Sequence, residues 1–261
     1  PTSRPAATTW RCARLDCSPD TADNLALKAA RLLDRRLRYR QGPVHIRIDK
    51  AIPVAGGMAG GSADAAAALV ACDALWGMRA EREHLDIIGA AIGSDVPFAL
   101  HGGIAMGSGR GEHITPVLAR GTYHWVFALS SEGLSTPAVY AECDRLRGDE
   151  PVPTPEASPA LMSALRSGDA TALGAALHND LQDPALSLRP DLAEVLSAGL
   201  EYGALGGVVS GSGPTIAFLT GSAEHALDLC VALTASGVAP QVTRARGPVL
   251  GAHIIAGPTR E

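Results

Sequence analysis

One stretch decides the fold, Lys50-Ala-Ile-Pro-Val-Ala-Gly-Gly-Met-Ala-Gly-Gly-Ser-Ala-Asp64, a glycine-rich loop between a predicted strand at 44–48 and a predicted helix at 63–76. Glycines at positions 56, 57, 60 and 61 permit positive φ angles and leave the backbone amides open to a ligand. The first-turn amides of the following helix have no intrahelical acceptor and carry about half a unit of positive charge. The stretch therefore predicts a loop that holds phosphate.

The same residues exclude two common phosphate-binding loops. The glycine spacing fits a Walker A motif, but that motif requires a lysine where this chain has Ser62. A Rossmann fingerprint requires G-x-G, whereas Gly56 and Gly57 are adjacent. Two interpretations stay open: a phosphate loop of another kind, and a tight turn that only packs a helix against a sheet.

A second segment, Gly93-Ser-Asp-Val-Pro-Phe98, places a carboxylate just beyond a predicted helix at 81–92. Pro97 disfavours a helical conformation at Val96, so we expect Asp95 to lie at a bend and not inside a helix. A catalytic base is often held in this way. The alternative is that Ser94 or Asp95 only caps a short helical turn.

Two more glycine-rich segments follow. The first is Gly206-Gly-Val-Val-Ser-Gly-Ser-Gly-Pro-Thr215, which by itself could be a hairpin turn between two strands. The second, Gly107-Ser-Gly-Arg-Gly-Glu112, is a weaker signal because many surface loops have this composition. Three such loops in one acidic chain favour a nucleotide-dependent enzyme.

Composition narrows the class of protein further. The chain has 261 residues, 46% of them hydrophobic, a net charge of −5 and an isoelectric point near 5.9. Its densest basic run, at 35–40, is expected to be a solvated helical face, so no nucleic acid partner is predicted. No apolar stretch of about 18 residues and no signal peptide are present, so no membrane partner is predicted. Five cysteines without a C-x-x-C pair indicate free thiols in a reducing cytoplasm and no zinc site.

Predicted helices and strands alternate without the strict repeat of a barrel, which indicates an α+β fold. We divide the chain into two domains, 1–121 and 122–261. In the first we expect helices at 25–39, 63–76 and 81–92, and strands at 44–48 and 103–106. In the second we expect helices at 135–146, 158–177, 190–202 and 223–236, and strands at 124–128, 207–210, 214–219, 240–245 and 252–256. A proline-rich connector at 150–155 is predicted to be irregular.

Taken together, these segments resemble the GHMP kinase superfamily, and within it the 4-diphosphocytidyl-2-C-methyl-D-erythritol kinases of non-mevalonate isoprenoid biosynthesis. The loop at 53–64 resembles the family's second motif, Gly93-Ser-Asp-Val-Pro97 its catalytic segment and Ser210-Gly-Ser-Gly-Pro-Thr215 its third motif. The match extends from about Asn24 to about Pro248. The resemblance implies a two-domain GHMP kinase fold, with an N-terminal domain like ribosomal protein S5 domain 2 and a ferredoxin-like C-terminal domain, truncated at its N-terminus.

By this resemblance, the γ-phosphoryl group of ATP is transferred, with Mg²⁺, to the 2-hydroxyl of the cytidyl diphosphate-linked methylerythritol, a small-molecule substrate. Asp95 matches the catalytic base, and phosphoryl transfer needs one such acceptor for the proton of the attacking hydroxyl. The implied ATP-binding set is Lys50, Pro53, Val54, Ala55, Gly56, Gly57, Met58, Ala59, Gly60, Gly61, Ser62 and Ala63. The implied substrate-binding set is Tyr140, Gly211, Ser212 and Gly213, with Tyr140 beside the cytosine. No metal-ligating side chain is assigned, and a homodimer is kept open as the assembly.

The chain departs from the family pattern in two places. Ala59 and Ala63 stand where the family often has a glycine and a serine. The family's first motif, with Pro-Ala-Lys, has no counterpart, because the only lysines are Lys28 and Lys50. We therefore expect an N-terminal portion to be missing and these residues alone to have negligible kinase activity. Two alternatives stay open: another GHMP kinase, of the homoserine or mevalonate type, which the Gly-Ser-Asp-Val-Pro segment disfavours, and a non-catalytic nucleotide-binding module.

Overall fold

The computed structural model describes residues 23–37, 44–52, 56–152 and 154–255, which form two compact units. Unit 1 comprises Ala59–Pro116 with the described residues before 53 and after 249. Unit 2 comprises Val117–Val249 together with Gly56–Met58. Within the glycine-rich stretch, Gly56–Met58 belong to unit 2, whereas the described residues on either side of them belong to unit 1.

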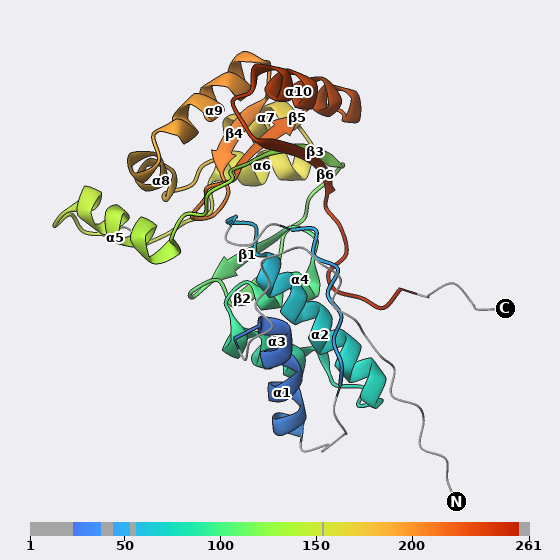
Figure 1. Ribbon diagram of the computed structural model, residues 1–261. Helices are drawn as coiled ribbons and strands as arrows, with labels where there is room; N and C mark the ends of the chain where they lie inside the picture. The colour runs from blue at the N-terminus through green and yellow to red at the C-terminus, as the bar shows by residue number, and fades with distance from the viewer. Residues whose placement is uncertain (1–22, 38–43, 53–55, 153, 256–261) are drawn as a thin grey trace, which may run out of the picture. The chain divides into compact units, whose positions relative to one another are not determined.

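Unit 1 contains four helices and a β-hairpin within its described part (Figure 1). The elements are α1 (Leu25–Leu37), α2 (Gly60–Trp76), α3 (Arg82–Ile92), α4 (Val96–His101), β1 (Ala105–Ser108) and β2 (His113–Pro116). Each helix contributes a buried aliphatic side chain to one core, namely Leu33, Leu69, Ile88 and Leu100. Alanines of α1 and α2 fill the space between these side chains and let the two helices approach closely.

Local sequence explains the bounds of the first two helices. The side-chain Oδ1 of Asn24 accepts a hydrogen bond of 2.9 Å from the Ala26 N–H and so caps the start of α1. Helix α2 is rich in alanine, which favours the helical state. It ends at Gly77, whose φ of 63° lets its N–H reach the carbonyls of Asp73 and Ala74.

Two strand predictions in unit 1 are wrong. Residues 44–48 are not assigned to a strand, and neither are 252–255, while residue 256 lies outside the described part. Leu250 forms only an isolated bridge with Gly102, and Ala252 donates a 2.9 Å hydrogen bond to the Ala99 carbonyl. A strand needs a ladder with a partner, which apolar alternation alone does not supply. Short elements α4 and β2 were not predicted, whereas α1 is confirmed to residue 37, α3 is confirmed, and β1 lies near its predicted position.

Unit 2 is built on a four-stranded antiparallel sheet in the order β4-β5-β3-β6. Its strands are β3 (Tyr123–Leu129), β4 (Gly206–Val209), β5 (Ile216–Thr220) and β6 (Gln241–Gly247). Its helices are α5 (Thr136–Arg147), α6 (Pro159–Ser167), α7 (Ala170–Ala175), α8 (Gln182–Leu188), α9 (Asp191–Glu201) and α10 (Ala223–Ser236). Helices connect β3 to β4 and β5 to β6, whereas β4 and β5 form a hairpin. This β-α-β-β-α-β order confirms the predicted ferredoxin-like topology.

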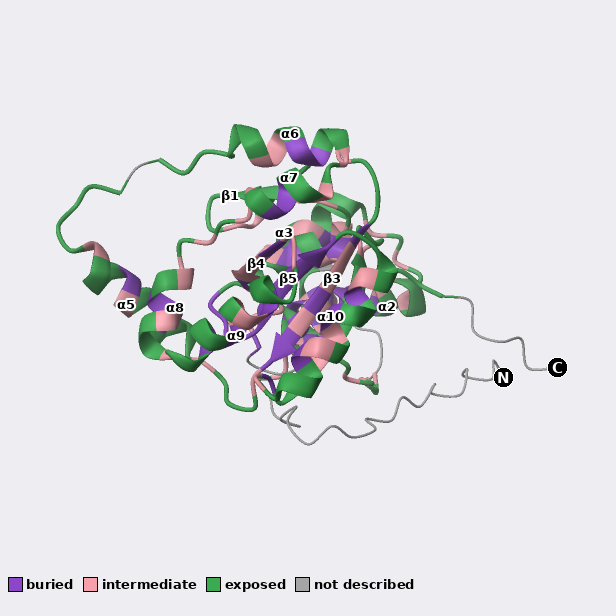
Figure 2. Ribbon diagram, turned by 90° about the horizontal axis from the view of Figure 1, so that it is seen from above, coloured by how far each residue is buried: buried purple, intermediate pink, exposed green. Residues whose placement is uncertain are grey.

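Helices α9 and α10 cover one face of this sheet (Figure 1). The core between them includes Val126, Ile216 and Phe218 from the sheet, and these side chains are fully buried. Figure 2 shows strand β5 coloured as buried. Gly199 of α9 packs so closely on the Phe218 ring that a Cβ there would lie 2.7 Å from its Cδ1. Strand alternation sends Trp125 and Phe127 to the opposite face.

The remaining predictions for unit 2 are largely confirmed. One predicted helix, 158–177, is two helices, because Gly168 adopts a φ of 76° and Asp169 begins α7 by accepting a hydrogen bond from Ala172. Helix α8 was not predicted. The described part of the 150–155 connector is irregular, as expected. Cys72, Cys143 and Cys230 are free thiols, and burial raises the pKa of Cys72 to about 11. Across the described ranges, no helix is both long and apolar enough to cross a membrane.

Candidate active site

The first turn of α2 presents three backbone amides without acceptors. The helix begins at Gly60, and its first bond is the 2.9 Å bond from the Ala63 N–H to the Ala59 carbonyl. Among the described residues, nothing accepts a hydrogen bond from the N–H groups of Gly60, Gly61 or Ser62. Unsatisfied amides at the positive end of a helix dipole suit an anionic ligand.

The positions of positive φ differ from the prediction. Gly60 and Gly61 were expected to adopt positive φ, but both are helical. Gly57 has the predicted positive φ, 69°, and Ala59 has an unpredicted one, 49°. Ala59 is the N-cap residue of α2, in a left-handed conformation that glycine adopts more easily than alanine. The turn thus falls one residue before the helix, and the absence of a Cβ at Gly60 and Gly61 lets the side chains of Ile52 and Leu25 pack closely on the first turn.

Lys50 lies against this first turn. Its Nζ is 2.5 Å from Oδ2 of Asp64, and the two side chains are only 9% and 20% exposed. A Cβ placed on Gly60 would lie 3.0 Å from the Lys50 Nζ. The lysine therefore adds positive charge beside the helix start, but its charge is already paired. Its membership of the ATP-binding set stays a prediction.

Asp95 lies in the turn between α3 and α4. Its side chain is exposed, makes no capping bond, and accepts no hydrogen bond from any described residue. It is not inside a helix, as predicted, but Val96 is helical, contrary to our expectation, because proline is tolerated in a first turn. The absence of a capping bond argues against a purely capping role. The exposed carboxylate is accessible to a ligand.

The turn before Asp95 abuts both α2 and the β1–β2 hairpin. A Cβ placed on Gly93 would lie 3.9 Å from Oγ of Ser62, a side chain that is only 8% exposed. A Cβ placed on Gly111 would lie 3.9 Å from Cβ of Ser94. The second motif, the catalytic segment and the weakly indicated loop at 107–112 therefore meet in unit 1. We call this group the unit 1 cluster: Gly60, Gly61, Ser62, Ser94 and Asp95.

A second group forms in unit 2, around the third motif. Ser210 Oγ donates a 2.8 Å hydrogen bond to the Gly57 carbonyl, which joins segments 153 positions apart. A Cβ on Gly57 would lie 2.7 Å from the Gly213 carbonyl oxygen and would also collide with that of Ser210. Only glycine fits this crossing, where φ is also positive. We call Gly57 and the loop Ser210–Thr215 the unit 2 cluster.

The predicted substrate-binding residues connect to α5. The hydroxyls of Ser212 and Thr136 are 2.8 Å apart, so the third motif is bonded to the first residue of α5. Tyr140 follows one turn later on the same helix, with 56% of its surface exposed. The structure thus brings Ser212 and the helix that carries Tyr140 together. Pro53, Val54 and Ala55, from the predicted ATP-binding set, lie outside the described residues.

Comparisons with known proteins first define the class. Residues 24–103 match the family model described as GHMP kinases N terminal domain, and residues 161–239 match GHMP kinases C terminal. The chain therefore has the GHMP kinase fold and is a small-molecule kinase of that class. A homoserine kinase from Cytophaga hutchinsonii, 19% identical, shares the fold with a TM-score of 0.69 over 91% of this chain and 79% of that one.

More similar relatives define the family within this class. A 4-diphosphocytidyl-2-C-methyl-D-erythritol kinase from Thermobifida fusca is 58% identical, covering 89% of this chain and 75% of the relative. The enzyme of that name from Streptomyces coelicolor is 54% identical, covering 89% and 77%. A crystal structure of 4-(cytidine 5'-diphospho)-2C-methyl-D-erythritol kinase aligns with a TM-score of 0.73 at 29% identity, covering 93% and 83%. The chain belongs to the 4-diphosphocytidyl-2-C-methyl-D-erythritol kinase family.

Proposed function

We propose that this protein transfers the γ-phosphoryl group of ATP to the 2-hydroxyl of 4-diphosphocytidyl-2-C-methyl-D-erythritol. The observation that carries the proposal is the free carboxylate of Asp95, which follows a turn packed on the helix with three unsatisfied amides. Relatives above 50% identity carry the name of this activity, which supports the substrate. Homoserine and mevalonate kinases share the fold at low identity and lend their substrates no support.

In this mechanism, different residues of the unit 1 cluster perform two separate tasks. The amides of Gly60, Gly61 and Ser62 bind phosphate oxygens of ATP, and the Ser62 hydroxyl is a further donor at the same place. Asp95 accepts the proton of the attacking 2-hydroxyl as the new phosphate ester bond forms and the bond to ADP breaks. Phosphoryl transfer asks little more of a protein than positioning, neutralisation of charge and such an acceptor.

Magnesium fits this arrangement in the manner usual for nucleotide enzymes. Within the described residues, no group of three or more His, Cys, Asp or Glu side chains could form a protein-only metal site. Mg²⁺ is commonly bound by substrate phosphates with one or two protein oxygens, and Ser62 and Asp95 could supply these. The ion would neutralise charge on the phosphates.

We further propose that turnover requires the lysine of the family's first motif, for which this sequence has no counterpart. Lys50 is the only lysine near the cluster, and its charge is paired with Asp64. The lysine of the family's first motif has no counterpart here. The chain of 261 residues should therefore show negligible turnover, and the natural gene product should show full turnover if its upstream sequence carries that lysine. Product formation is compared at equal folded concentration.

The substrate is tested by offering the natural gene product ATP with four acceptors in parallel. These are the cytidyl diphosphate-linked methylerythritol, homoserine, mevalonate and galactose. We expect phosphorylation of the first alone. Phosphorylation of another acceptor would replace the proposed substrate, and binding of ATP without any transfer would favour a non-catalytic nucleotide-binding module.

A further inference from the structure

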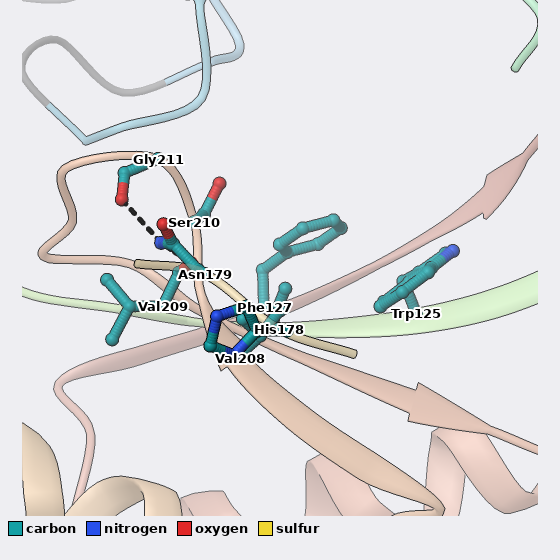
Figure 3. A pocket seen from close by; sticks show the side chains of 9 residues that line it. Trp125, Phe127, His178, Asn179, Val208, Val209, Ser210 and Gly211 are labelled. Atoms are coloured by element: carbon teal, nitrogen blue, oxygen red, sulfur yellow. Dashed lines mark hydrogen bonds between the residues drawn. The ribbon is translucent and has the colours of Figure 1, made fainter. Parts of the chain in front are cut away.

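The loop of the unit 2 cluster is held by Asn179, a side chain that the sequence patterns do not single out. Its Nδ2 donates hydrogen bonds of 2.8 Å to the Val209 carbonyl and 2.7 Å to the Gly211 carbonyl. Its Oδ1 accepts a 3.0 Å bond from the Leu181 N–H. Figure 3 shows the amide directed at the loop from the rim of a cavity of about 380 Å³, which Trp125 also lines.

These three bonds require an amide in one orientation. A primary amide offers two donor hydrogens at nitrogen and acceptor lone pairs at oxygen, and here both atoms are used. Reversing the amide would place its oxygen against two carbonyl oxygens. A carboxylate would do the same, with added negative charge and no donor. Gln182 holds the neighbouring peptide from the other direction, since its Oε1 accepts a 3.1 Å bond from the Val209 N–H.

The Asn179 bonds determine where the next amide points. In a trans peptide the C=O and N–H groups point in opposite directions, and the Gly211–Ser212 peptide is trans. Since the Gly211 carbonyl is directed at Asn179, the Ser212 N–H is directed away from it. Among the described residues, this N–H donates to no acceptor, although Ser212 is only 8% exposed. Most polar groups of well-buried residues have a partner, so a ligand atom is a natural acceptor for this N–H.

We propose that Asn179 is a positioning residue that aims the Ser212 N–H at an anionic oxygen of the substrate diphosphate. The identity of this ligand rests on the proposed function. Asn179 itself touches no substrate. It acts by holding one peptide of the loop in the orientation that recognises the ligand, while the bond between Ser212 and Thr136 holds the side chain of the same residue.

The test uses the chain labelled with ¹⁵N and cytidine diphosphate as the probe, because binding needs no turnover. In the wild type, we expect the Ser212 amide resonance to shift on titration. Asn179→Asp keeps the shape of the side chain but loses both donors, and we expect affinity for the probe to fall about tenfold, in the range for a hydrogen bond to a charged group. The matched control is Asp180→Asn, the reverse exchange at the next residue, which is 77% exposed and bonds only to the exposed His178. Its affinity should stay within about twofold of the wild type.

Two results would overturn the inference. One is a Ser212 amide that does not respond to cytidine diphosphate in the wild type. The other is an Asn179→Asp protein that unfolds at lower urea concentration yet binds the probe as tightly as the wild type, which is the signature of a purely structural role. If Asn179→Asp does not fold, Asn179→Ala, which removes the donors without adding charge, is read in the same way.

The proposed function can fail independently of this inference. If the Ser212 amide responds and the response depends on Asn179, but the natural gene product phosphorylates another acceptor, the positioning role stands and the substrate is wrong. If the methylerythritol substrate is phosphorylated but Asn179→Asp binds cytidine diphosphate normally, the positioning role is wrong and the function stands.

Discussion

The unit 1 and unit 2 clusters differ in whether their polar groups have hydrogen-bond partners within the protein. In unit 1, the Asp95 carboxylate and three amides of α2 have no partner among the described residues. In unit 2, Ser210 Oγ, Ser212 Oγ and the Asn179 amide are all hydrogen-bonded, whereas the Ser212 N–H has no acceptor among the described residues. Polar groups without a protein partner can exchange bound water for a ligand, whereas groups bonded within the protein keep a fixed orientation. This difference supports our proposal that the reacting groups lie in unit 1, whereas unit 2 supplies groups that are held in fixed positions.

The largest expected effect tests the chemical cluster. Asp95→Asn keeps the shape of the side chain but removes the proton acceptor, so turnover should fall by about 10²- to 10⁴-fold while the affinity for ATP changes little. The measurement is single-turnover phosphoryl transfer by the natural gene product, with calorimetric titration of an ATP analogue. An Asp95→Asn enzyme with normal turnover would remove Asp95 from the mechanism.

The next effect tests the geometry of the loop crossing. Gly57→Val introduces a β-branched residue at positive φ and against two carbonyl oxygens, so the affinity for an ATP analogue should fall by at least about 30-fold. Calorimetric titration measures it. The matched control is Gly121→Val, where φ is also positive, 87°, but no atom lies within 4 Å of the new Cβ. Equal affinities in both variants would show that the crossing does not shape the nucleotide loop.

A smaller effect is expected at Tyr140. Because more than half of this side chain is exposed, its stacking on a cytosine should lie at the low end of the range for such contacts, about 1 kcal/mol, or roughly fivefold. Tyr140→Ala should raise the KM for the cytidyl substrate by that factor and leave the KM for ATP unchanged. Tyr202→Ala, at another exposed tyrosine, is the control. Unchanged values for both substrates would make Tyr140 an ordinary surface residue.

The pH dependence of stability tests the hydrogen bonds that Glu142 of α5 accepts. Hydrogen bonds from Arg145 and then Ser187 lower the pKa of Glu142 from its usual 4.5 to about 2. Because the folded pKa is depressed, the stability that Glu142 contributes is present above about pH 4.5 and is lost as the pH falls toward 2. Urea unfolding across this window should show that loss in the wild type but not in Glu142→Gln. Parallel pH curves for the two proteins would mean that the bonds do not form in solution.

The smallest effect concerns Ala59. Its left-handed conformation costs about 1 to 2 kcal/mol for alanine, and the greater freedom of glycine in the unfolded chain offsets part of any gain. Ala59→Gly should therefore stabilise the protein by about 0.5 kcal/mol. The urea unfolding midpoint is compared with that of the wild type. A clear loss of stability would contradict the positive φ at this position.

Much of the fold could be predicted because its signals are local. Helices such as α10 have clear periodicity, and the ferredoxin-like topology followed from the family resemblance. The strand at 44–48 was wrong because alternation cannot say whether a partner strand exists. The division into domains at residues 121 and 122, the cytoplasmic location and the homodimer stay predictions.

The site was predictable only where residues near in sequence act together. Asp95 and the α2 loop belong to continuous motifs. Asn179 was missed because the carbonyls it binds are 30 and 32 positions away, and no local pattern marks an isolated asparagine. The contact between Gly57 and Ser210 likewise could not be predicted from the sequence, although positive φ at Gly57 was.

The central claim, that the unpartnered amides of unit 1 bind the phosphates, has one direct test. The ¹⁵N-labelled chain is titrated with a non-hydrolysable ATP analogue while all amide resonances are followed. The account predicts that Gly60, Gly61 and Ser62 show the largest shifts, with the Asp95 turn responding alongside them. Saturable binding of the analogue with these three amides unmoved would contradict it.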